Sequence, residues 1–594
     1  MRKISPRLLA LMMAGAVTVT SITPVTGYQT ITVNAATDSQ EKEAAQGYQT
    51  NLTGFDYKKG DWKETKDGLY SNAVDKGDCF AFSKTTAKNF VYSTDVTFKR
   101  NQGAATLIFR FNNNLDNKEC YAVNIDGGSH KCKLWRWQEN SDYQLIDEKE
   151  VKATDDEKYT LKVVAYDSWI SYYVNDTLVA STGDYTLQKD DKGQSTVLTE
   201  GSLGLLNWNG EMTFQNTYYT ELNDQNTPEL KNISVSSSTG DVEKAAQFTS
   251  TEPIMIQYVK NNAETVDLNI EKKNKNADVQ VEYDGKIYND GKNIPVKVGK
   301  NYITVKSTVQ GENGQTATLT YRVNVHRRAA DKTYYNEAYR NQYHYSVKDG
   351  WGNDLNGLVK YKGTYHMFYQ FYDDTKWGPM HWAHATSKDL IHWEEQPIAL
   401  YPDANGAMFS GCIVADEKNT SGLFGDGNEG GLVALITADG NGQRIKVAYS
   451  TDEGKTWKKT NKIAADWSKD PLNNRDFRDP KVFRWENKWF MVIAGGPLRI
   501  YSSDNLTDWK CESTYADLHT ECPDLYPIET KDGVKWVLSR GGRFYKVGDF
   551  KQVDGKWKFV ADEAYKNSDG VMNFGKDSYA AMTYYVPVSY THLT

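Results

Sequence analysis

Short runs in which apolar and polar residues alternate dominate the chain from residue 47 onward. Three of the clearest are FVYSTDVTF (90–98), YTLKVVAY (159–166) and VDLNIEK (266–272). Because successive side chains of a strand point to opposite faces of its sheet, this period of two predicts strands with one buried face. Glycine, asparagine and aspartate separate the runs, as they do in turns between strands. The pattern predicts an all-β protein.

The alternating runs fall into groups that indicate separate domains. Residues 47–223 predict one β-sandwich, which ends at a polar stretch that contains Pro228. Residues 224–328 predict a second, smaller sandwich of immunoglobulin or cadherin type. A third region covers residues 331–594. A chain of 594 residues is too long for a single core, which agrees with several domains.

The third region contains a loose repeat. TSKDLIHW (386–393), STDEGKTW (450–457) and SSDNLTDW (502–509) each combine a serine, a central acidic turn and a closing tryptophan. Strand-like runs such as GLVALIT (431–437) and KWFMVIAGG (488–496) accompany them. Repeated units of short strands are typical of propeller blades. The alternative is an ordinary β-sandwich whose tryptophans are spaced by chance.

Composition adds two indications about the partner. The chain has 39 Tyr and 16 Trp, and flat rings with a polar edge suit both β-rich cores and the faces of sugars. Its formal net charge of -8, without a basic run, argues against a nucleic-acid partner.

The first 46 residues have the pattern of an export signal. Three basic residues among the first seven precede an apolar run over residues 8–19, and Val33-Asn34-Ala35 offers a small-residue cleavage site. We expect a signal peptide over residues 1–35, long in the style of Gram-positive bacteria, and a linker over 36–46. The apolar run is short for a membrane span, so the predicted location is extracellular.

The cysteines and one glycine motif carry no predicted chemistry. Six cysteines without C-x-x-C spacing predict neither a zinc site nor a disulfide framework. A Cys120–Cys132 bridge is one alternative, and free buried thiols are the expected state. Residues 425–430 match G-x-G-x-x-G, but the loop precedes a strand and no helical pattern follows, so we interpret it as a turn.

Three acids stand at unusual places. Asp354 lies in WGNDLNG, Asp479 in NRDFRDPKVF and Glu521 in HTECPDLYP, each beside an aromatic strand and in a separate repeat unit. A propeller brings the inner strands of its blades around one axial pocket, where such residues can meet. Cleavage of a glycosidic bond needs one carboxyl that protonates the leaving oxygen and one carboxylate that attacks the anomeric carbon. We expect neighbouring amides to keep Asp354 ionised and the apolar Cys522 to raise the pKa of Glu521.

Four segments in this order resemble glycoside hydrolase family 32, the fructan hydrolases and invertases: WGNDLNG (351–357), FSGC (409–412), FRDPKVF (477–483) and ECPDLYP (521–527). The similarity runs from about residue 335 to 585. It implies a five-bladed β-propeller and a retaining mechanism. Asp354 would be the nucleophile, Glu521 the general acid/base, and Asp479 the residue that holds the fructosyl hydroxyls. The resemblance also implies a sugar pocket lined by Asn353, Gln370, Trp377, Phe409, Ser410 and Arg478.

The sequence departs from the family pattern in places. Gly352 and Leu355 stand where the family usually has Met and Pro, and Cys412 stands where Ser or Ala is more usual. Family members also add a C-terminal β-sandwich after the fifth blade, whereas this sequence ends at SYTHLT, so we expect an incomplete propeller region.

Residues 47–223 resemble carbohydrate-binding module family 66, a lectin-like sandwich associated with fructans. GAATLIFRFNNN (103–114), ECYAVNID (119–126) and the pair Trp135 and Trp137 carry this similarity. Core packing is the alternative role for these tryptophans and for Trp62, Trp169 and Trp208. Arg110 is expected either at an exposed strand end or in an internal salt bridge.

These observations predict a secreted retaining glycoside hydrolase of β-fructosidic bonds. Levan is the expected substrate, with inulin or sucrose as further ones, and the chemistry requires no metal and no cofactor. The alternatives are a fructan-binding protein with an inactive or truncated catalytic domain, and a related propeller glycosidase or fructosyltransferase.

Overall fold

The structure is a computed structural model that describes residues 48–586, except for 101, 138–142, 185–199, 251, 312–313, 342, 428, 441 and 574. The expected signal peptide and linker lie outside the described residues. The described chain is built from strands, with short 3-10 helices at η4 (Asp331–Thr333), η5 (Trp467–Lys469) and η6 (Glu563–Tyr565). None of its helices has the length and hydropathy of a membrane span.

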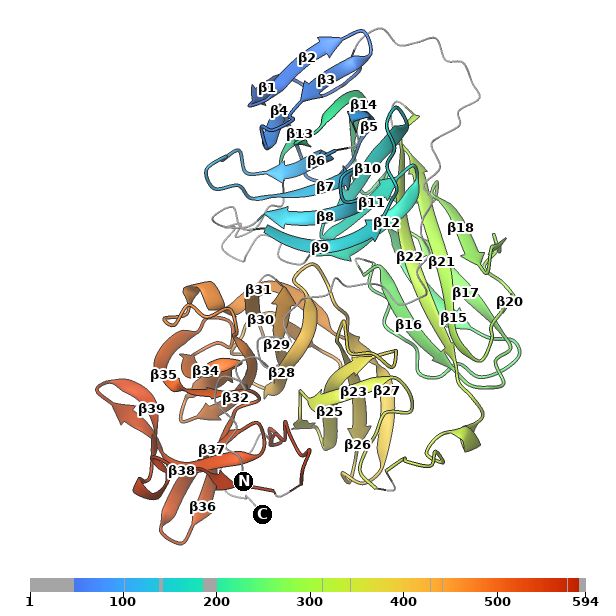
Figure 1. Cartoon of the computed structure of the whole chain (residues 1–594). Helices are drawn as coiled ribbons and strands as arrows, with labels where there is room; N and C mark the ends of the chain where they lie inside the picture. Colours follow the sequence, from blue (N-terminus) through green and yellow to red (C-terminus); the bar gives the residue numbers. More distant parts are fainter. Residues whose placement is uncertain are drawn as a thin grey trace, which may run out of the picture.

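Two seven-stranded sheets pack face to face in the N-terminal sandwich (Figure 1). The first contains, in spatial order, β1 (Phe55–Lys58), β4 (Asp78–Ala87), β13 (Gly201–Trp208), β6 (Ala104–Phe111), β7 (Cys120–Asp126), β8 (Lys131–Trp137) and β9 (Tyr143–Glu150). The second contains β12 (Thr177–Gly183), β11 (Trp169–Val174), β10 (Lys158–Tyr166), β5 (Phe90–Arg100), β14 (Glu211–Glu221), β3 (Gly68–Asn72) and β2 (Asp61–Thr65).

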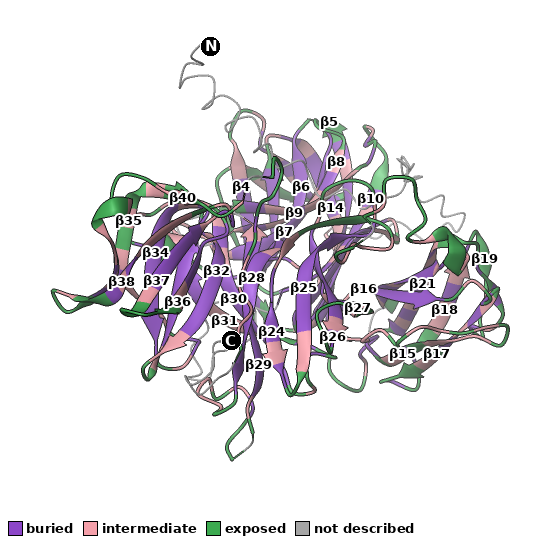
Figure 2. Cartoon of the chain, turned by 90° about the horizontal axis from the view of Figure 1, so that it is seen from below, coloured by how far each residue is buried: buried purple, intermediate pink, exposed green. Residues whose placement is uncertain are grey.

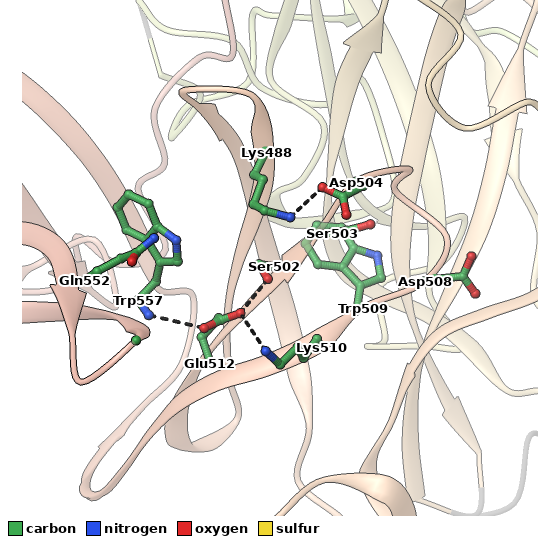
Figure 3. A pocket seen from close by; sticks show the side chains of 11 residues that line it. Lys488, Ser502, Ser503, Asp504, Asp508, Trp509, Lys510, Glu512, Gln552 and Trp557 are labelled. Carbon is green, nitrogen blue, oxygen red and sulfur yellow. Dashed lines mark hydrogen bonds and ion pairs between the residues drawn. The ribbon is translucent and has the colours of Figure 1, made fainter.

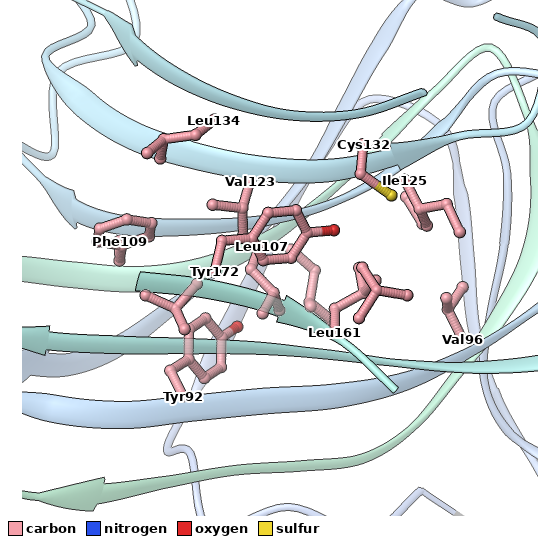
Figure 4. Close-up of a cluster of buried hydrophobic side chains, with 14 of the residues drawn as sticks. Tyr92, Val96, Leu107, Phe109, Val123, Ile125, Cys132, Leu134, Leu161 and Tyr172 are labelled. Atoms are coloured by element: carbon pink, nitrogen blue, oxygen red, sulfur yellow. The ribbon is translucent and has the colours of Figure 1, made fainter. Parts of the chain in front are cut away.

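Alternation along these strands produces the core between the two sheets (Figure 4). Leu107 and Phe109 of β6 and Val123 of β7 point inward to meet Tyr92 and Tyr172 of the opposite sheet, and all five are fully buried. Residues two apart on a strand share a face, so the period seen in the sequence becomes a continuous apolar layer.

Several alternatives left open by the sequence are resolved in this sandwich. Trp169 is buried and Trp208 is 44% exposed, while the other three tryptophans of the sandwich are half-buried. Arg110 is buried, not exposed, and its guanidinium donates to the carbonyls of Lys88 and Asp167, both at 2.9 Å. All six cysteines are free thiols, so the Cys120–Cys132 bridge does not form.

The second sandwich packs on the outer face of the first. Its sheets are β15 (Leu230–Ser236), β17 (Thr265–Lys272) and β20 (Ile294–Pro295), and β16 (Ile254–Val259), β22 (Thr316–Arg327), β21 (Gly299–Gln310), β18 (Asp278–Tyr283) and β19 (Lys286–Ile287). The Trp169 ring meets Tyr321 edge-on at a centroid distance of 4.6 Å, and Tyr173 donates to the Thr318 carbonyl at 2.7 Å. These aromatic contacts hold the two sandwiches together.

Four sheets of a β-propeller follow, in which sequential strands pair as antiparallel neighbours. They contain β23 (Trp351–Leu355), β24 (Val359–Tyr361), β25 (Thr364–Tyr372), β26 (His381–Ser387) and β27 (Trp393–Leu400); β28 (Ala407–Asp416), β29 (Gly431–Gly440), β30 (Gly442–Ser450) and β31 (Lys458–Asp466); β32 (Arg478–Trp485), β33 (Lys488–Ala494), β34 (Gly496–Ser503) and β35 (Lys510–Thr520); β36 (Asp524–Thr530), β37 (Gly533–Arg540), β38 (Phe544–Val553), β39 (Lys556–Ala561) and β40 (Gly570–Val571). Many strand residues of the blades are buried, and many residues of the connecting turns are exposed (Figure 2).

The repeat ending in tryptophan marks the same turn in three blades. Each copy joins the third long strand of a blade to the fourth, and its indole N–H bonds the carbonyl three residues earlier. That earlier residue has a positive φ in all three copies: Leu390, Gly454 and Leu506. The shared geometry confirms that the spacing of the tryptophans reflects blades and not chance.

A final segment connects the fourth blade with the first. The Thr583 N–H donates to Asp524 of β36 at 2.7 Å, and the Tyr585 N–H donates to the Leu358 carbonyl beside β24 at 2.8 Å. The Lys360 N–H returns a bond to the Tyr585 carbonyl at 2.9 Å. Within the described residues, this segment therefore bridges the inner strands of the fourth and first blades.

Candidate active site

The predicted site residues lie at irregular positions of the inner strands. The pairing register shifts between Gly352 and Leu355 in β23, between Phe409 and Gly411 in β28, and between Arg478 and Lys481 in β32. Asp354, Ser410 and Asp479 fall inside these three shifts. A β-bulge breaks the alternation of a strand and re-aims one side chain. The bulges thus turn three polar side chains toward a common space.

Asp354 is half-buried and has three neighbouring donors. The Ser410 hydroxyl lies 2.8 Å from its Oδ2, the Asn353 amide 3.3 Å from its Oδ1, and the Cys522 thiol 3.4 Å from its Oδ2. Hydrogen bonds to a carboxylate are stronger than neutral ones and fix its orientation. One oxygen of Asp354 is therefore held from two sides, in the manner a positioned nucleophile requires.

Asp479 is buried, with φ at 62°. Its N–H donates to Thr437 Oγ1 at 3.0 Å, and its Oδ2 accepts the Cys522 N–H at 2.9 Å. Burial raises the pKa of Asp479 to about 6, and the charges of Asp354 and Glu521 add to this against the opposing effect of Arg478. Burial is therefore the main cause of the raised pKa of this carboxyl.

Glu521 precedes β36 and is held by two donors. Arg478 Nη2 lies 2.6 Å from Oε1, and the Tyr579 hydroxyl lies 2.9 Å from Oε2. Burial raises the pKa of Glu521, but the hydrogen bond and charge of Arg478, with the bond from Tyr579, outweigh it and leave the pKa below its usual value. The sequence-based expectation of a raised pKa is therefore wrong. The expectation considered only the neighbouring Cys522, whereas the pKa is lowered by the guanidinium of Arg478, which lies 43 positions away in the sequence.

Two further residues of the site were not predicted. The Cys522 thiol lies 3.4 Å from Asp354 and 3.7 Å from Asp479, so it touches two of the acids. Its position directly after Glu521 was a usable signal. Tyr579 bonds Glu521 across 58 positions and belongs to no recognisable motif, so no local pattern indicated its role.

The remaining predicted residues differ in position. Trp377 is 53% exposed and meets Phe409 edge-on at a centroid distance of 5.4 Å, so the pair offers aromatic surface beside Ser410. Gln370 is buried, and its amide donates to the Met408 carbonyl at 2.8 Å. It therefore supports β28 of the second blade from β25 of the first.

A separate hollow of about 400 Å³ lies at the rim of the third and fourth blades (Figure 3). Its acid Glu512 is buried and accepts hydrogen bonds from the Ser502 hydroxyl and the backbone N–H of Trp557. Lys488 forms an ion pair with Asp504. None of the predicted site residues lines it, and the acids named here already have partners. In the described ranges, no group of three His, Cys, Asp or Glu side chains has the arrangement of metal ligands.

The three parts of the chain match three family models. The model described as the glycosyl hydrolases family 32 N-terminal domain matches residues 344–593. This region is therefore similar to glycosyl hydrolase family 32. A 3-keto-alpha-glucoside-1,2-lyase-like domain matches residues 47–219, and a cadherin-like beta sandwich domain matches residues 230–328. For the middle sandwich, the match favours the cadherin alternative.

Two curated relatives are longer than this chain. The chain is 68% identical to the fructan beta-fructosidase of Streptococcus mutans over 529 residues, which cover 89% of the chain and 37% of the relative. It is 42% identical to the levanase of Bacillus subtilis over 285 residues, which cover 43% of the chain and 40% of the relative. The chain thus spans less than half the length of both relatives.

Solved structures give more limited similarities. The exo-inulinase from Aspergillus awamori is 35% identical, with a TM-score of 0.38, over 43% of this chain and 58% of that one. The carbohydrate binding module CBM66 from Bacillus subtilis is 27% identical, with a TM-score of 0.25, over 29% of this chain and 98% of that one.

Proposed function

We propose that the chain is a secreted, retaining glycoside hydrolase that cleaves β-fructosidic bonds of fructans. The observation that carries the proposal is the contact network in which the Cys522 thiol touches Asp354 and Asp479 while Arg478 joins Glu521. Three carboxyl groups from separate blades gather at one place. The match to the family 32 model and the names of the relatives, fructan beta-fructosidase and levanase, support fructan as the substrate class, with levan first and inulin or sucrose as further substrates.

In the proposed reaction Glu521 protonates the departing oxygen and Asp354 attacks the anomeric carbon to form a fructosyl-enzyme. Glu521 then removes a proton from water, which attacks the same carbon and releases fructose. Ser410 holds Asp354 in line for attack. Asp479 and Arg478 bond the hydroxyls of the fructosyl ring, where charge changes as the transition state forms.

Glu521 must gain a proton before it can act as an acid. Arg478 and Tyr579 favour its ionised form in the unliganded site. We propose that fructosyl hydroxyls accept hydrogen bonds from Arg478 on binding, which breaks the hydrogen bond that helps to keep the pKa of Glu521 low. Substrate binding would thereby prepare the acid.

The test compares the wild-type chain with Asp354→Asn on levan, inulin and sucrose. Product-size analysis should find free fructose with the wild type and at least about a thousandfold slower release with the variant, because an amide cannot form the glycosyl ester. Retained activity in Asp354→Asn would contradict the nucleophile assignment. Oligosaccharides longer than the substrate would indicate transfer, and polysaccharide retention without release would indicate a binding protein.

A further inference from the structure

The loop between β27 and β28, residues 401–406, is inserted into the N-terminal sandwich. Ala404 is 1% exposed and belongs to the apolar core cluster of that sandwich, although it is a propeller residue. Its N–H donates to the Gly183 carbonyl at 2.8 Å, and its own carbonyl accepts the side-chain amide of Gln144 at 3.0 Å. The N-terminal sandwich therefore binds both backbone polar groups of Ala404 in this loop.

The cadherin-like sandwich holds the other end of the same loop. The Ile256 N–H donates to the Tyr401 hydroxyl at 3.0 Å. Lys459 donates to the Tyr401 carbonyl at 2.6 Å and forms ion pairs with Asp403 at 3.3 Å and Glu252 at 2.7 Å. These charged side chains are at most 10% exposed, so the pairs are shielded from solvent.

The loop itself is a tight turn with little room to move. Asp403 Oδ1 accepts both the N–H and the side-chain amide of Asn405, at 2.8 and 2.9 Å. Gly406 has φ at 116°, and a Cβ on it would lie 1.8 Å from the Asp439 carbonyl oxygen. A displacement of residue 404 is therefore passed to residue 407 and not absorbed in between.

Strand β28 begins directly after this turn and carries the site. Both backbone polar groups of Met408 are bonded. Its N–H donates to the Met380 carbonyl at 3.0 Å, and its carbonyl accepts the side-chain amide of Gln370 at 2.8 Å. Two residues later Ser410 donates to Asp354 at 2.8 Å. Ser410, whose side chain orients the proposed nucleophile, thus lies six positions after Ala404, the residue that the N-terminal sandwich holds.

We propose that the N-terminal sandwich is a positioning element of the sugar site and acts through Gln144 on the 401–406 loop. This inference rests on the proposed function and extends it, because the sandwich then affects even substrates too small to reach it. A module that served only to tether polysaccharide would need no buried contact with the strand that carries Phe409 and Ser410.

The test uses Gln144→Ala in the full chain, with Gln315→Ala as the matched control. Gln315 also joins two domains, through Ser93, Tyr218 and Thr220, but its bonds lie between the two sandwiches and away from the propeller. Hydrogen exchange of residues 407–411 and the kinetics of sucrose hydrolysis are measured well below the unfolding temperature. Sucrose is chosen because it carries only one fructosyl group.

In Gln144→Ala, we expect the amide hydrogens of residues 407–411 to exchange about fivefold faster than in the wild type, since the buried Ala404 carbonyl loses its hydrogen bond from Gln144. KM for sucrose should rise about threefold, with a smaller change in kcat, while Gln315→Ala changes neither. Unchanged exchange in Gln144→Ala, or equal effects in the control, would overturn the inference. If the wild type releases no fructose, the proposed function fails, and the exchange data still decide whether the sandwich is coupled to β28.

Discussion

The hydrogen bond from Ser410 to Asp354 gives the sharpest test of the site. Ser410→Ala removes one oxygen from a side chain that is 5% exposed, so it leaves the fold and the carboxylate in place. A hydrogen bond to a charged group contributes about 1.5–3 kcal/mol, and because Asp354 is half-buried we take the lower half of that range. Each 1.4 kcal/mol corresponds to about a factor of ten in rate. We therefore expect kcat/KM to fall about twelve- to fortyfold.

The assay is fructose release from sucrose at one pH, with far-ultraviolet circular dichroism and thermal unfolding as checks on folding. Ser450→Ala is the matched control, because Ser450 is also buried and bonds within a blade turn that is remote in sequence from the predicted site residues. This control should lose some stability and keep its kcat/KM. A Ser410→Ala enzyme within twofold of the wild type, or an equal loss in the control, would refute the proposed role of Ser410.

Three further outcomes follow from the same structure. Arg478→Met removes the group that lowers the pKa of Glu521, so that pKa rises and the alkaline limb of kcat/KM against pH should move upward; a downward shift would contradict the pairing. Burial lowers the pKa of His366 to about 4 and that of His384 well below its usual value. Below about pH 6.5 the unfolded chain therefore binds more protons at these two side chains than the folded chain does. The contribution of these two histidines to the free energy of unfolding should be fully present above about pH 6.5 and should fall as the pH drops toward 4. Urea midpoints that stay constant over this window would exclude the effect. Gly454→Ala forces a side chain into φ at 80° and should cost about 1 kcal/mol in thermal unfolding, whereas an unchanged midpoint would mean that the turn relaxes.

The period of two in the sequence was sufficient to predict the strands, and the tryptophan repeat was sufficient to predict the blade turns. Both signals are local, because each depends on a few adjacent residues. The motifs around Asp354, Asp479 and Glu521 also identified side chains that the fold brings together. What the sequence lacked was information on long-range pairs.

Two such pairs changed the interpretation. The charge state of Glu521 depends on Arg478, which comes from another blade. The docking of the N-terminal sandwich depends on Gln144 and Ala404, which are 260 positions apart. No composition or spacing rule links residues at such separations, since only the folded arrangement brings them into contact.

The bulges in β23, β28 and β32 also bear on how such a site can diverge. In a regular strand, one inserted or deleted residue reverses the facing of every side chain beyond it and exposes the blade core to water. A bulge already holds an unpaired residue, so a length change there alters one side chain and leaves the rest of the strand in register. The side chains at these three points can therefore be repositioned by small steps, at little cost to the folding of the blades.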